Sequence, residues 1–498
     1  MKIILIALYD VNSFGIRILH NTLSKAGHDV ESVFFNKMKT NQYHSTTDID
    51  VLLDFLKQRA PDLIGISLRS SFFQLATHIT RQIKENLKAT VIWGGTHPTI
   101  SPEESIQIAD MVCIGEGEEA ILEVADSLRM GNQPRKIANV LINYNKEIIR
   151  NPVRSPIDID KVAFPDWSNE DKYFIYDNQL LVDCNSELNI YKDKYYPIMA
   201  SRGGPYSCTY CCNNVYKDIY SKSNIRKRSI NNIMEELVLA KKTYPHLERI
   251  VFSDDMMVTN EQWVKDFSVE FKRIQLPFNC QFIPVYVKEP IIRALRNAGM
   301  STVTMGIQSG SERVRKEVFK RNYNNNLIIK CAKLFKKYKL NVNYDLILDN
   351  PFETHRETKM TLDLLLEIPP PYHLRMYSLI YFPHTELTQA ALDKGIIGPD
   401  DVEDVKQKAL KEWRVNLDSE TKSKEMIFLN NLISMTAIGF VPRWYISFLS
   451  NNTIIKKNPV ILVYINRMFI TMGRIKKGIY YVFIKRDFKM IIKYFNGK

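Results

Sequence analysis

The chain has 498 residues, of which 45% are hydrophobic and 25% charged, and its formal net charge is +13. This composition is that of a globular protein, and the length allows two or three domains. Seven cysteines in so long a chain exclude a disulfide scaffold. The absence of any run of about 18 uninterrupted apolar residues excludes a transmembrane helix. The N-terminal apolar run reaches Asp10 without a cleavage-type segment, so we expect no secretory signal.

The first part of the chain, residues 1–140, alternates β-rich runs with helical patterns. The expected strands span residues 2–8, 29–35, 62–67, 90–93 and 110–114. This alternation predicts an α/β domain with a doubly wound parallel sheet, in which ligands bind beyond the carboxyl ends of the strands. The spacing of Ser101, Pro102 and Glu104 predicts a helix that begins with a capping box.

Three further segments follow. Residues 141–193 contain several prolines, and we interpret them as a linker with short strands. Residues 194–395 repeat the β-α alternation, which predicts a partial (β/α)6 barrel with its active site at the carboxyl ends of the strands. Its expected strands span residues 195–200, 249–253, 279–284, 302–307, 341–348 and 375–380, with a helix over 229–242. Residues 396–498 are expected to be mostly helical.

Three cysteines, Cys208, Cys211 and Cys212, crowd into five residues after the first strand of the second series. Thiolates on one tight loop can turn toward a common metal centre, so this loop is the candidate metal site. The crowding also indicates a reducing, cytoplasmic compartment. A set of structural or zinc-binding thiols is the alternative interpretation.

The segment around these cysteines resembles the cluster loop of radical S-adenosylmethionine (SAM) enzymes. That family's pattern is C-x3-C-x2-C, with an aromatic residue before the last cysteine, and here Cys208, Tyr210 and Cys211 match it. Gly204 stands at the position of the first cysteine. In the family, three cysteines bind a [4Fe-4S] cluster whose fourth iron is left open for SAM.

Three explanations of Gly204 remain open. Cys212 or Cys184 can replace the missing thiol, or the chain is a degenerate relative that keeps only the scaffold. The third explanation is a variant, because one base change converts cysteine to glycine.

Further segments resemble the same family in order and spacing across residues 195–390. Two carboxylates, Asp254 and Asp255, follow the strand expected at residues 249–253, and a Gly-Ile-Gln-Ser-Gly segment begins at Gly306. The resemblance implies a SAM pocket formed by Tyr210, Ser253, Asp254, Asp255, Gln308, Ser309 and Gly310. For the two acids, capping of the following helix is the alternative.

The first domain resembles the cobalamin-binding domain that precedes such barrels. Glycine-rich loops follow two strands, and glycine lets a planar ligand approach the backbone closely. The residues assigned to this cobalamin site are Asn12, Ser13, Ser67, Gly94, Gly95, Thr96, His97, Gly115, Glu116 and Gly117. Asn12 takes the place of the histidine that ligates cobalt in well-known cobalamin proteins, so we expect cobalamin without a histidine ligand. We expect His97 to be a hydrogen-bonding residue of its loop. A flavodoxin-like domain that binds flavin or nothing is the alternative.

The resemblance implies a function. A reduced cluster would cleave SAM to a 5′-deoxyadenosyl radical, which abstracts hydrogen from an unactivated carbon, and methyl transfer from methylcobalamin is the commonest outcome. The expected partners are a small-molecule or lipid-like substrate and an electron donor such as flavodoxin or ferredoxin. The first alternative is a non-catalytic cobalamin-binding or scaffold relative, which Gly204 favours. No catalytic side chain is assigned.

The end of the chain is strongly basic. Residues 451–498 contain eleven Lys or Arg against one acid, Asp487, together with many Ile, Phe and Tyr. Such a tail suits peripheral contact with an anionic membrane, which is a second alternative function. Nucleic acid is a competing partner that we do not expect, and a helical cap with a solvated basic face is the third interpretation.

Overall fold

The structure is a computed structural model that describes residues 1–35, 46–182, 194–220, 225–258, 260–407, 413–419 and 422–483. The chain divides into two compact units. Unit 1 comprises Met1–Met257 and Ile380–Lys411, and unit 2 comprises Val258–Leu379 and Glu412–Lys498. Cys184 lies outside the described residues, so the structure does not address its expected role as a replacement ligand.

Unit 1 begins with a sheet that has nine strands among the described residues, in the order β7-β6-β5-β4-β3-β1-β2-β8-β9. Its strands are β1 (Lys2–Ala7), β2 (Asp29–Phe35), β3 (Leu63–Ser67), β4 (Thr90–Gly94), β5 (Met111–Cys113), β6 (Val140–Tyr144), β7 (Glu147–Arg150), β8 (Lys172–Tyr176) and β9 (Gln179–Leu181). Strands β1 to β5 run parallel to one another, as predicted, whereas β6 pairs with β5 in the antiparallel direction. The segment interpreted as a linker supplies β7, β8 and β9 to this sheet, which extends it at both edges.

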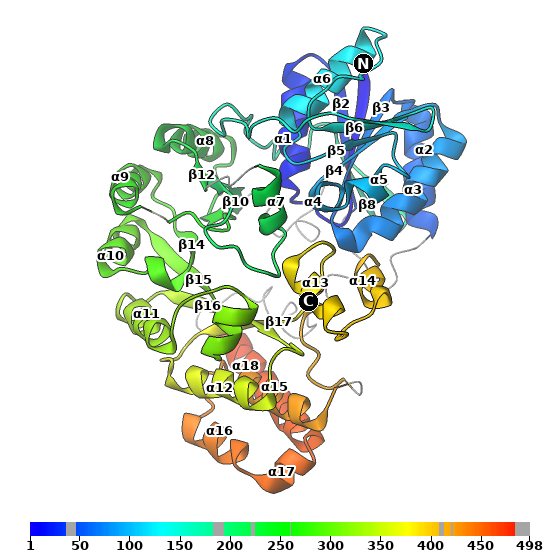
Figure 1. Ribbon diagram of the computed structural model, residues 1–498. Helices are drawn as coiled ribbons and strands as arrows, with labels where there is room; N and C mark the ends of the chain where they lie inside the picture. The colour runs from blue at the N-terminus through cyan, green and yellow to red at the C-terminus, as the bar shows by residue number, and fades with distance from the viewer. Residues whose placement is uncertain are drawn as a thin grey trace. The chain divides into compact units, whose positions relative to one another are not determined.

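Helices cover both faces of this sheet (Figure 1). The helices are α1 (Phe14–Lys25), α2 (Thr46–Arg59), α3 (Phe73–Asn86), α4 (Thr96–Ile100), α5 (Pro102–Ser105) and α6 (Glu118–Arg129). Alternate residues of β1 enter different cores: Ile4 packs with side chains of α2 and α3, and Leu5 packs with side chains of α1 and α6. This alternation follows from the two-residue period of a strand, and it confirms the doubly wound fold.

The capping box predicted at Ser101 is wrong. Ser101 precedes α5, but its side chain makes no capping hydrogen bond, and its hydroxyl is buried without a hydrogen-bond partner. The carboxylate of Glu104, which the box requires, instead accepts a hydrogen bond from Lys406 at 2.6 Å. The Glu104 carboxylate therefore forms a long-range ion pair with Lys406 and does not form the predicted capping box with Ser101.

The rest of unit 1 carries the cysteine loop. Its elements are β10 (Tyr195–Ile198), β11 (Ser201–Arg202), α7 (Asn213–Ile219), β12 (Arg226–Lys227), α8 (Ile230–Thr243), β13 (Arg249–Phe252), α13 (Glu386–Asp393) and α14 (Pro399–Val405). Helix α8 begins as predicted, because the Ser229 side chain caps it by accepting the N–H of Asn232. Strand β10 pairs in parallel with β13.

Unit 2 continues the β-α alternation and ends in helices. Its elements are α9 (Glu261–Phe271), β14 (Phe278–Phe282), α10 (Glu289–Ala298), β15 (Met300–Gln308), α11 (Asn325–Lys337), β16 (Asn341–Leu348), α12 (His355–Glu367), β17 (His373–Ser378), α15 (Lys424–Met435), α16 (Arg443–Ser450), α17 (Thr453–Lys457) and α18 (Val460–Phe483). Strands β14 to β17 pair in sequence and in parallel. The strand order β10-β13-β14-β15-β16-β17 confirms the predicted half-barrel sheet, and the helices after β17 confirm the helical C-terminal part.

Candidate functional site

The carboxyl ends of the parallel strands in unit 1 carry the polar and glycine residues that the sequence singled out. Ser67 ends β3, Gly94 ends β4, and Gly115 follows β5. Because carboxyl ends of parallel strands meet at one edge of a sheet, these residues lie together. They line a cavity of about 440 Å³.

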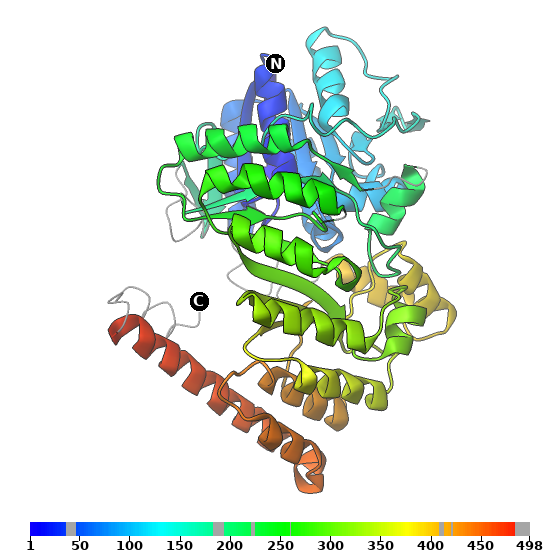
Figure 2. The same ribbon diagram turned by 90° about the vertical axis from the view of Figure 1, so that its left-hand side faces the viewer.

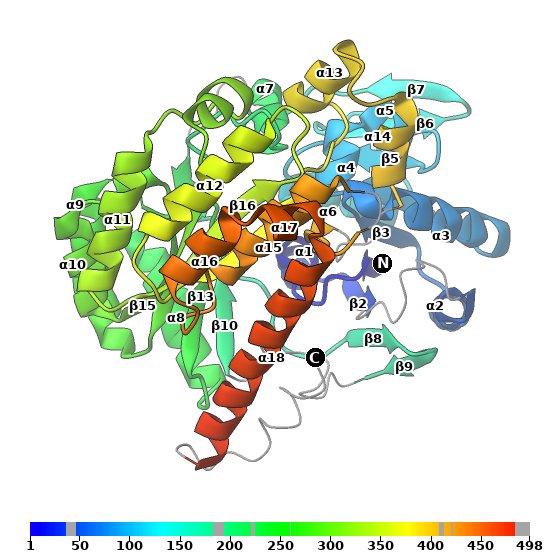
Figure 3. The same cartoon turned by 90° about the horizontal axis from the view of Figure 1, so that it is seen from below.

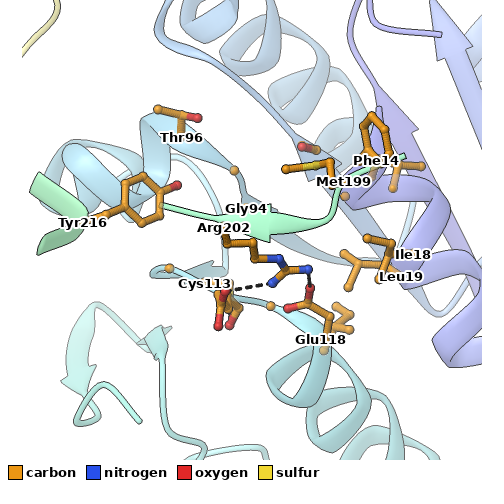
Figure 4. Close-up of a pocket in the computed structure, with 18 of the residues that line it drawn as sticks. Phe14, Ile18, Leu19, Gly94, Thr96, Cys113, Glu118, Met199, Arg202 and Tyr216 are labelled. Atoms are coloured by element: carbon orange, nitrogen blue, oxygen red, sulfur yellow. Dashed lines mark hydrogen bonds and ion pairs between the residues drawn. The ribbon is translucent and has the colours of Figure 1, made fainter. Parts of the chain in front are cut away.

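The cavity is shared with the segment that precedes the cysteines. Figure 4 shows Met199, Arg202 and Tyr216 together with Gly94, Thr96 and Glu118 around it. Apolar side chains of β1, α1 and α6, among them Leu5, Ile18 and Ile121, also line it. Of the residues assigned to the cobalamin site, the cavity is lined by Ser67, Gly94, Gly95, Thr96, Gly115, Glu116 and Gly117.

Glycine is required at two of these positions. At Gly95, φ is +100°, and a Cβ would lie 2.8 Å from the carbonyl oxygen of Leu68. At Gly115, φ is +77°, and a Cβ would lie 2.0 Å from the hydroxyl oxygen of Tyr220. Gly94 differs, because the nearest atom to its Cβ position is Cys113 Cβ at 4.0 Å. Its missing side chain therefore leaves space beside the cavity, and this glycine surface with its apolar surroundings fits a large, flat ligand such as a corrin.

One arginine joins the glycine-rich loop to the cysteine loop. Arg202 Nη1 donates to Glu116 Oε1 at 2.8 Å, and Arg202 Nη2 donates to Glu118 Oε1 at 2.5 Å. Arg226 also pairs with Glu116. Burial alone would raise the pKa of Glu116, but the hydrogen bonds and charges of Arg226 and Arg202 outweigh it and lower that pKa. Glu116 is therefore held as a carboxylate beside the cavity.

Helix α7, which follows the cysteines at once, adds two tyrosines to the cavity. The Tyr220 hydroxyl accepts the backbone N–H of Glu116 at 2.7 Å. Tyr216 is hydrogen-bonded to Thr96 and Thr99, and burial raises its pKa to about 12. The sequence reasoning missed both residues. Their spacing of four on a helix that follows the motif was the available signal, because it places them on one face.

The cysteine loop does not assemble a complete metal site. Cys208 is buried, Cys211 and Cys212 are partly exposed, and the Cys211 thiol is hydrogen-bonded to Cys212, which lowers the Cys212 pKa. Within the described ranges, no three His, Cys, Asp or Glu residues are grouped so as to hold a metal ion. Two matched cysteines and Gly204 therefore do not by themselves fit a cluster bound by three thiolates.

The position of Gly204 nevertheless accepts a side chain. Its φ lies outside the left-handed region, unlike that of Gly203 at +94°. A Cβ at Gly204 would meet Asn213 Nδ2 at 3.4 Å as its nearest neighbour. Gly204 lines the cavity, so a cysteine here would present its thiol without backbone strain.

The two carboxylates after β13 have different surroundings. Asp254 is buried and accepts hydrogen bonds from the Ala200 N–H at 2.9 Å and the Ser201 hydroxyl at 2.6 Å. Burial raises its pKa to about 6. Asp255 lines the cavity and accepts a hydrogen bond from Asn213 at 2.7 Å. Asp254 thus positions the backbone before the cysteine loop, and Asp255 is the acid that faces the cavity.

Several other assigned residues do not line this cavity. They are Asn12, Ser13, His97, Tyr210, Ser253, Asp254 and the three cysteines. The Asn12 backbone N–H donates to Asp10 at 3.3 Å, while its side-chain oxygen is buried without a hydrogen-bond partner. His97 is buried, and its Nδ1 is hydrogen-bonded to the Ser70 hydroxyl at 3.1 Å. This bond fits the expectation that His97 is a hydrogen-bonding residue of its loop.

In unit 2, Ser309 and Gly310, which the sequence assigned to the SAM pocket, form hydrogen bonds with other residues of unit 2. Ser309 donates to Glu353 at 2.6 Å, and the Gly310 N–H donates to Thr361 at 2.7 Å. A Cβ at Gly310 would lie 2.4 Å from Thr361 Cα, so close packing on α12 requires this glycine. Gln308 has φ +68° where β15 ends, so the backbone turns sharply at the segment that the sequence assigned to SAM.

Comparisons with known proteins agree with this geometry. Residues 2–125 match the B12 binding domain family, and residues 198–365 match the Radical SAM superfamily. An uncharacterised methyltransferase of Pyrococcus horikoshii is 26% identical over 354 residues, 69% of this chain and 72% of that protein. The cytidylyl-2-hydroxyethylphosphonate methyltransferase of Streptomyces wedmorensis is 23% identical over 314 residues, and the match spans about half of that protein, 55% of each chain.

A solved structure shares the fold. The radical SAM methyltransferase TsrM of Kitasatospora setae, with cobalamin and a [4Fe-4S] cluster bound, superposes with a TM-score of 0.59 at 16% identity, over 79% of this chain and 75% of that one. The two domain matches occur in the order that the sequence predicted. The chain therefore carries a B12 binding domain followed by a domain of the Radical SAM superfamily.

Proposed function

We propose that this chain is a cobalamin-dependent radical SAM enzyme that modifies an unactivated carbon of a small-molecule or lipid-like substrate by methyl transfer. The observation that carries the proposal is the cavity in unit 1, where the glycine-rich loop of the B12 binding domain meets the loop that leads to Cys208. Two of the matched relatives are named as methyltransferases, and the TsrM structure holds cobalamin and a [4Fe-4S] cluster.

The residues of unit 1 supply a binding surface for the corrin. Gly94 and Gly117 leave space for a flat face, while Ser67 and Thr96 contribute hydroxyl groups to the lining. The apolar side chains of β1 and α1 exclude water from the same space. When bound, cobalamin would supply a transferable methyl group, and the protein would orient it and keep water away.

Asn12 is the residue at the position of the missing histidine ligand. Its side-chain oxygen is buried without a hydrogen-bond partner among the described residues, and an amide is a poor substitute for imidazole as a metal ligand. We therefore propose that cobalamin binds here without a protein histidine on cobalt.

The radical chemistry requires a cluster, and the described residues provide an incomplete thiolate set for it. The competing function is a cobalamin-binding scaffold that has lost the cluster, and Gly204 is the observation that favours it. An external electron donor of the flavodoxin or ferredoxin type would be needed by the enzyme and not by the scaffold.

A first experiment separates these functions. The full chain is reconstituted anaerobically with hydroxocobalamin, iron and sulfide, and bound cobalamin and iron are counted with and without SAM. Bound cobalamin with about four irons per chain, as for one [4Fe-4S] cluster, supports the enzyme. Bound cobalamin without iron supports the scaffold. Absence of bound cobalamin contradicts the proposal.

A matched pair of variants tests the location of the corrin. Gly94→Val places a side chain in the cavity, whereas Gly439→Val lies outside the cavity lining and has a similar clearance, 4.0 Å from its Cβ position to Pro371 Cβ. We expect Gly94→Val to lose cobalamin and Gly439→Val to retain it. Equal retention by both variants would place the corrin elsewhere.

A further inference from the structure

Three consecutive helices of unit 2, α16, α17 and α18, present large apolar side chains to solvent. Trp444 and Phe448 are exposed on α16, and Ile454 is exposed on α17. Helix α18 is the longest of the three, and it continues past the orange helices α15 to α17 (Figure 2, Figure 3). These surfaces lie outside the B12 binding and radical SAM matches, which end at residue 365.

Helix α18 has two apolar faces. On one face Leu462 and Val463 are buried, and Asn466 donates to Asn431 of α15 at 2.9 Å. The other face carries an exposed stripe of Ile461, Tyr464, Met468, Met472 and Ile475. Steps of three and four residues place all five on one side of the helix. A helix that covers a core normally shows a polar face to water, so the second apolar face lacks a partner among the residues that the structure describes.

Basic residues border this stripe. At about 100° per residue, Arg467 and Arg474 fall on one side of it and Lys476 on the other. Lys456 and Lys457 precede α18, and residues 451–498 contain eleven basic residues and a single acid. Two of the basic residues are paired with acids of other segments, Arg467 with Asp418 and Lys456 with Glu425. The described part of the chain contains no helix that is long and apolar enough to cross a membrane. The pattern is therefore that of a helix which lies in a membrane interface.

Charge distinguishes the candidate occupants. A second copy of this chain would bring the same positive charges to the stripe and be repelled. Nucleic acid would pair with the basic residues but would leave the five apolar side chains in water. An anionic bilayer satisfies both, because its headgroups take the basic residues and its acyl region takes the apolar ones.

We propose that α18, with the exposed apolar residues of α16 and α17, docks the protein on an anionic lipid surface. This peripheral contact goes beyond the proposed function, because neither the cavity nor the cysteine loop takes part in it. It depends on apolar burial and on charge, so both raised salt and loss of the stripe weaken it.

The test is flotation of the full chain with vesicles. Vesicles of phosphatidylcholine with phosphatidylglycerol are compared with vesicles of phosphatidylcholine alone. The test variant is Met468→Glu with Met472→Glu, at residues that are 51% and 48% exposed on α18. The control is Val238→Glu with Leu239→Glu, at residues that are 59% and 53% exposed on α8. Both variants change the net charge equally, so only the location differs.

We expect the parent chain and the control variant to float with the anionic vesicles, and the stripe variant to bind at least about tenfold more weakly. Binding to neutral vesicles should be weaker, and added salt should lower binding to the anionic ones. Equal binding of the two variants would overturn the proposal. So would the absence of binding to anionic vesicles, self-association through the stripe, or nucleic-acid binding that the stripe variant retains.

Discussion

Arg202 Nη2 lies 2.5 Å from Glu118 Oε1, which ties the loop that leads to Cys208 to the first turn of α6. The same guanidinium reaches Glu116 in the glycine-rich loop. All three side chains are mostly buried, with exposed fractions of 22%, 10% and 13% for Arg202, Glu118 and Glu116. The B12 binding domain and the start of the radical SAM domain are therefore joined beside the cavity by one residue of the cysteine-loop motif.

Removing this arginine should destabilise unit 1. Arg202→Met leaves Glu118 partly buried without its cation, and loss of one partner of a buried pair costs about 3 kcal/mol. Urea unfolding followed by circular dichroism measures the change. The control is Arg150→Met, which removes an exposed pair with Glu103 and should cost less than about 1 kcal/mol. Equal losses for the two variants would mean that the Arg202 pairs do not hold the loops together.

The contact between Gly115 and Tyr220 makes a second prediction. Gly115→Ala must accommodate a Cβ that would lie 2.0 Å from the Tyr220 hydroxyl oxygen, and it also adopts φ +77°. Gly131→Ala is the matched control, because its φ is +74° and nothing lies within 4 Å of its Cβ position. Both variants pay about 1 kcal/mol for the backbone conformation, and Gly115→Ala should cost about 1–2 kcal/mol more.

Removal of the hydroxyl checks the cause. In Tyr220→Phe the closest remaining ring atom would lie 2.8 Å from the new Cβ, so the clash is smaller. The double variant Gly115→Ala/Tyr220→Phe should therefore be less destabilised than the sum of the single variants. Additive losses would show that the clash is not with the hydroxyl.

The sequence predicted elements where a local pattern decides the structure. The β-rich segments predicted at 29–35 and 341–348 are β2 and β16, with the same bounds. The carboxyl ends of the first strands gathered the glycine-rich loops because parallel strands end at one edge. Interactions with distant partners were not predictable from the sequence. The Glu104 carboxylate, for example, does not form the expected capping box but accepts a hydrogen bond from Lys406, 302 positions away. Tyr220 enters the site only because α7 packs against the loop at Glu116.

His97 makes the stability depend on pH. Burial, aided by the charges of Lys406 and His384, lowers its pKa to about 3, and Glu104 lies 3.7 Å from its Nε2. The unfolded chain takes up the proton near pH 6.5, whereas the folded chain does so only near 3. The contribution of neutral His97 to the free energy of unfolding is therefore fully present above pH 6.5, and it decreases as the pH falls toward 3.

The free energy of unfolding should reveal this dependence. Between pH 6.5 and 5, His97 should contribute a loss of about 2 kcal/mol, and His97→Gln should remove that part of the pH dependence. The control is His78→Gln, which makes the same replacement at an exposed histidine of α3. The same slope in parent and His97→Gln would show that another group titrates in this range.

Restoring the missing thiol at Gly204 should improve the ligand set for an iron–sulfur cluster. The φ of Gly204 lies outside the left-handed region, and its Cβ position is 3.4 Å from Asn213 Nδ2, so we expect Gly204→Cys to fold. It completes the C-x3-C-x2-C spacing with Cys208 and Cys211, and three thiolates on one loop are a better iron–sulfur ligand set than two. After anaerobic reconstitution, we expect the Gly204→Cys variant to hold more iron and sulfide per chain than the parent. The electron paramagnetic resonance spectrum of the reduced protein is recorded as a second measurement.

Because any added thiol can bind iron, a control must show that the effect depends on the position of the new cysteine. Ser207→Cys adds a thiol to the same loop at an exposed position outside the spacing. Its iron content should match that of the parent, while Gly204→Cys exceeds both and gives a signal that SAM perturbs. Equal iron in the parent and Gly204→Cys at about four per chain would mean that another ligand already completes the cluster. If both the parent and Gly204→Cys held almost no iron, a third cysteine alone would not restore the cluster site. That result would favour the non-catalytic scaffold.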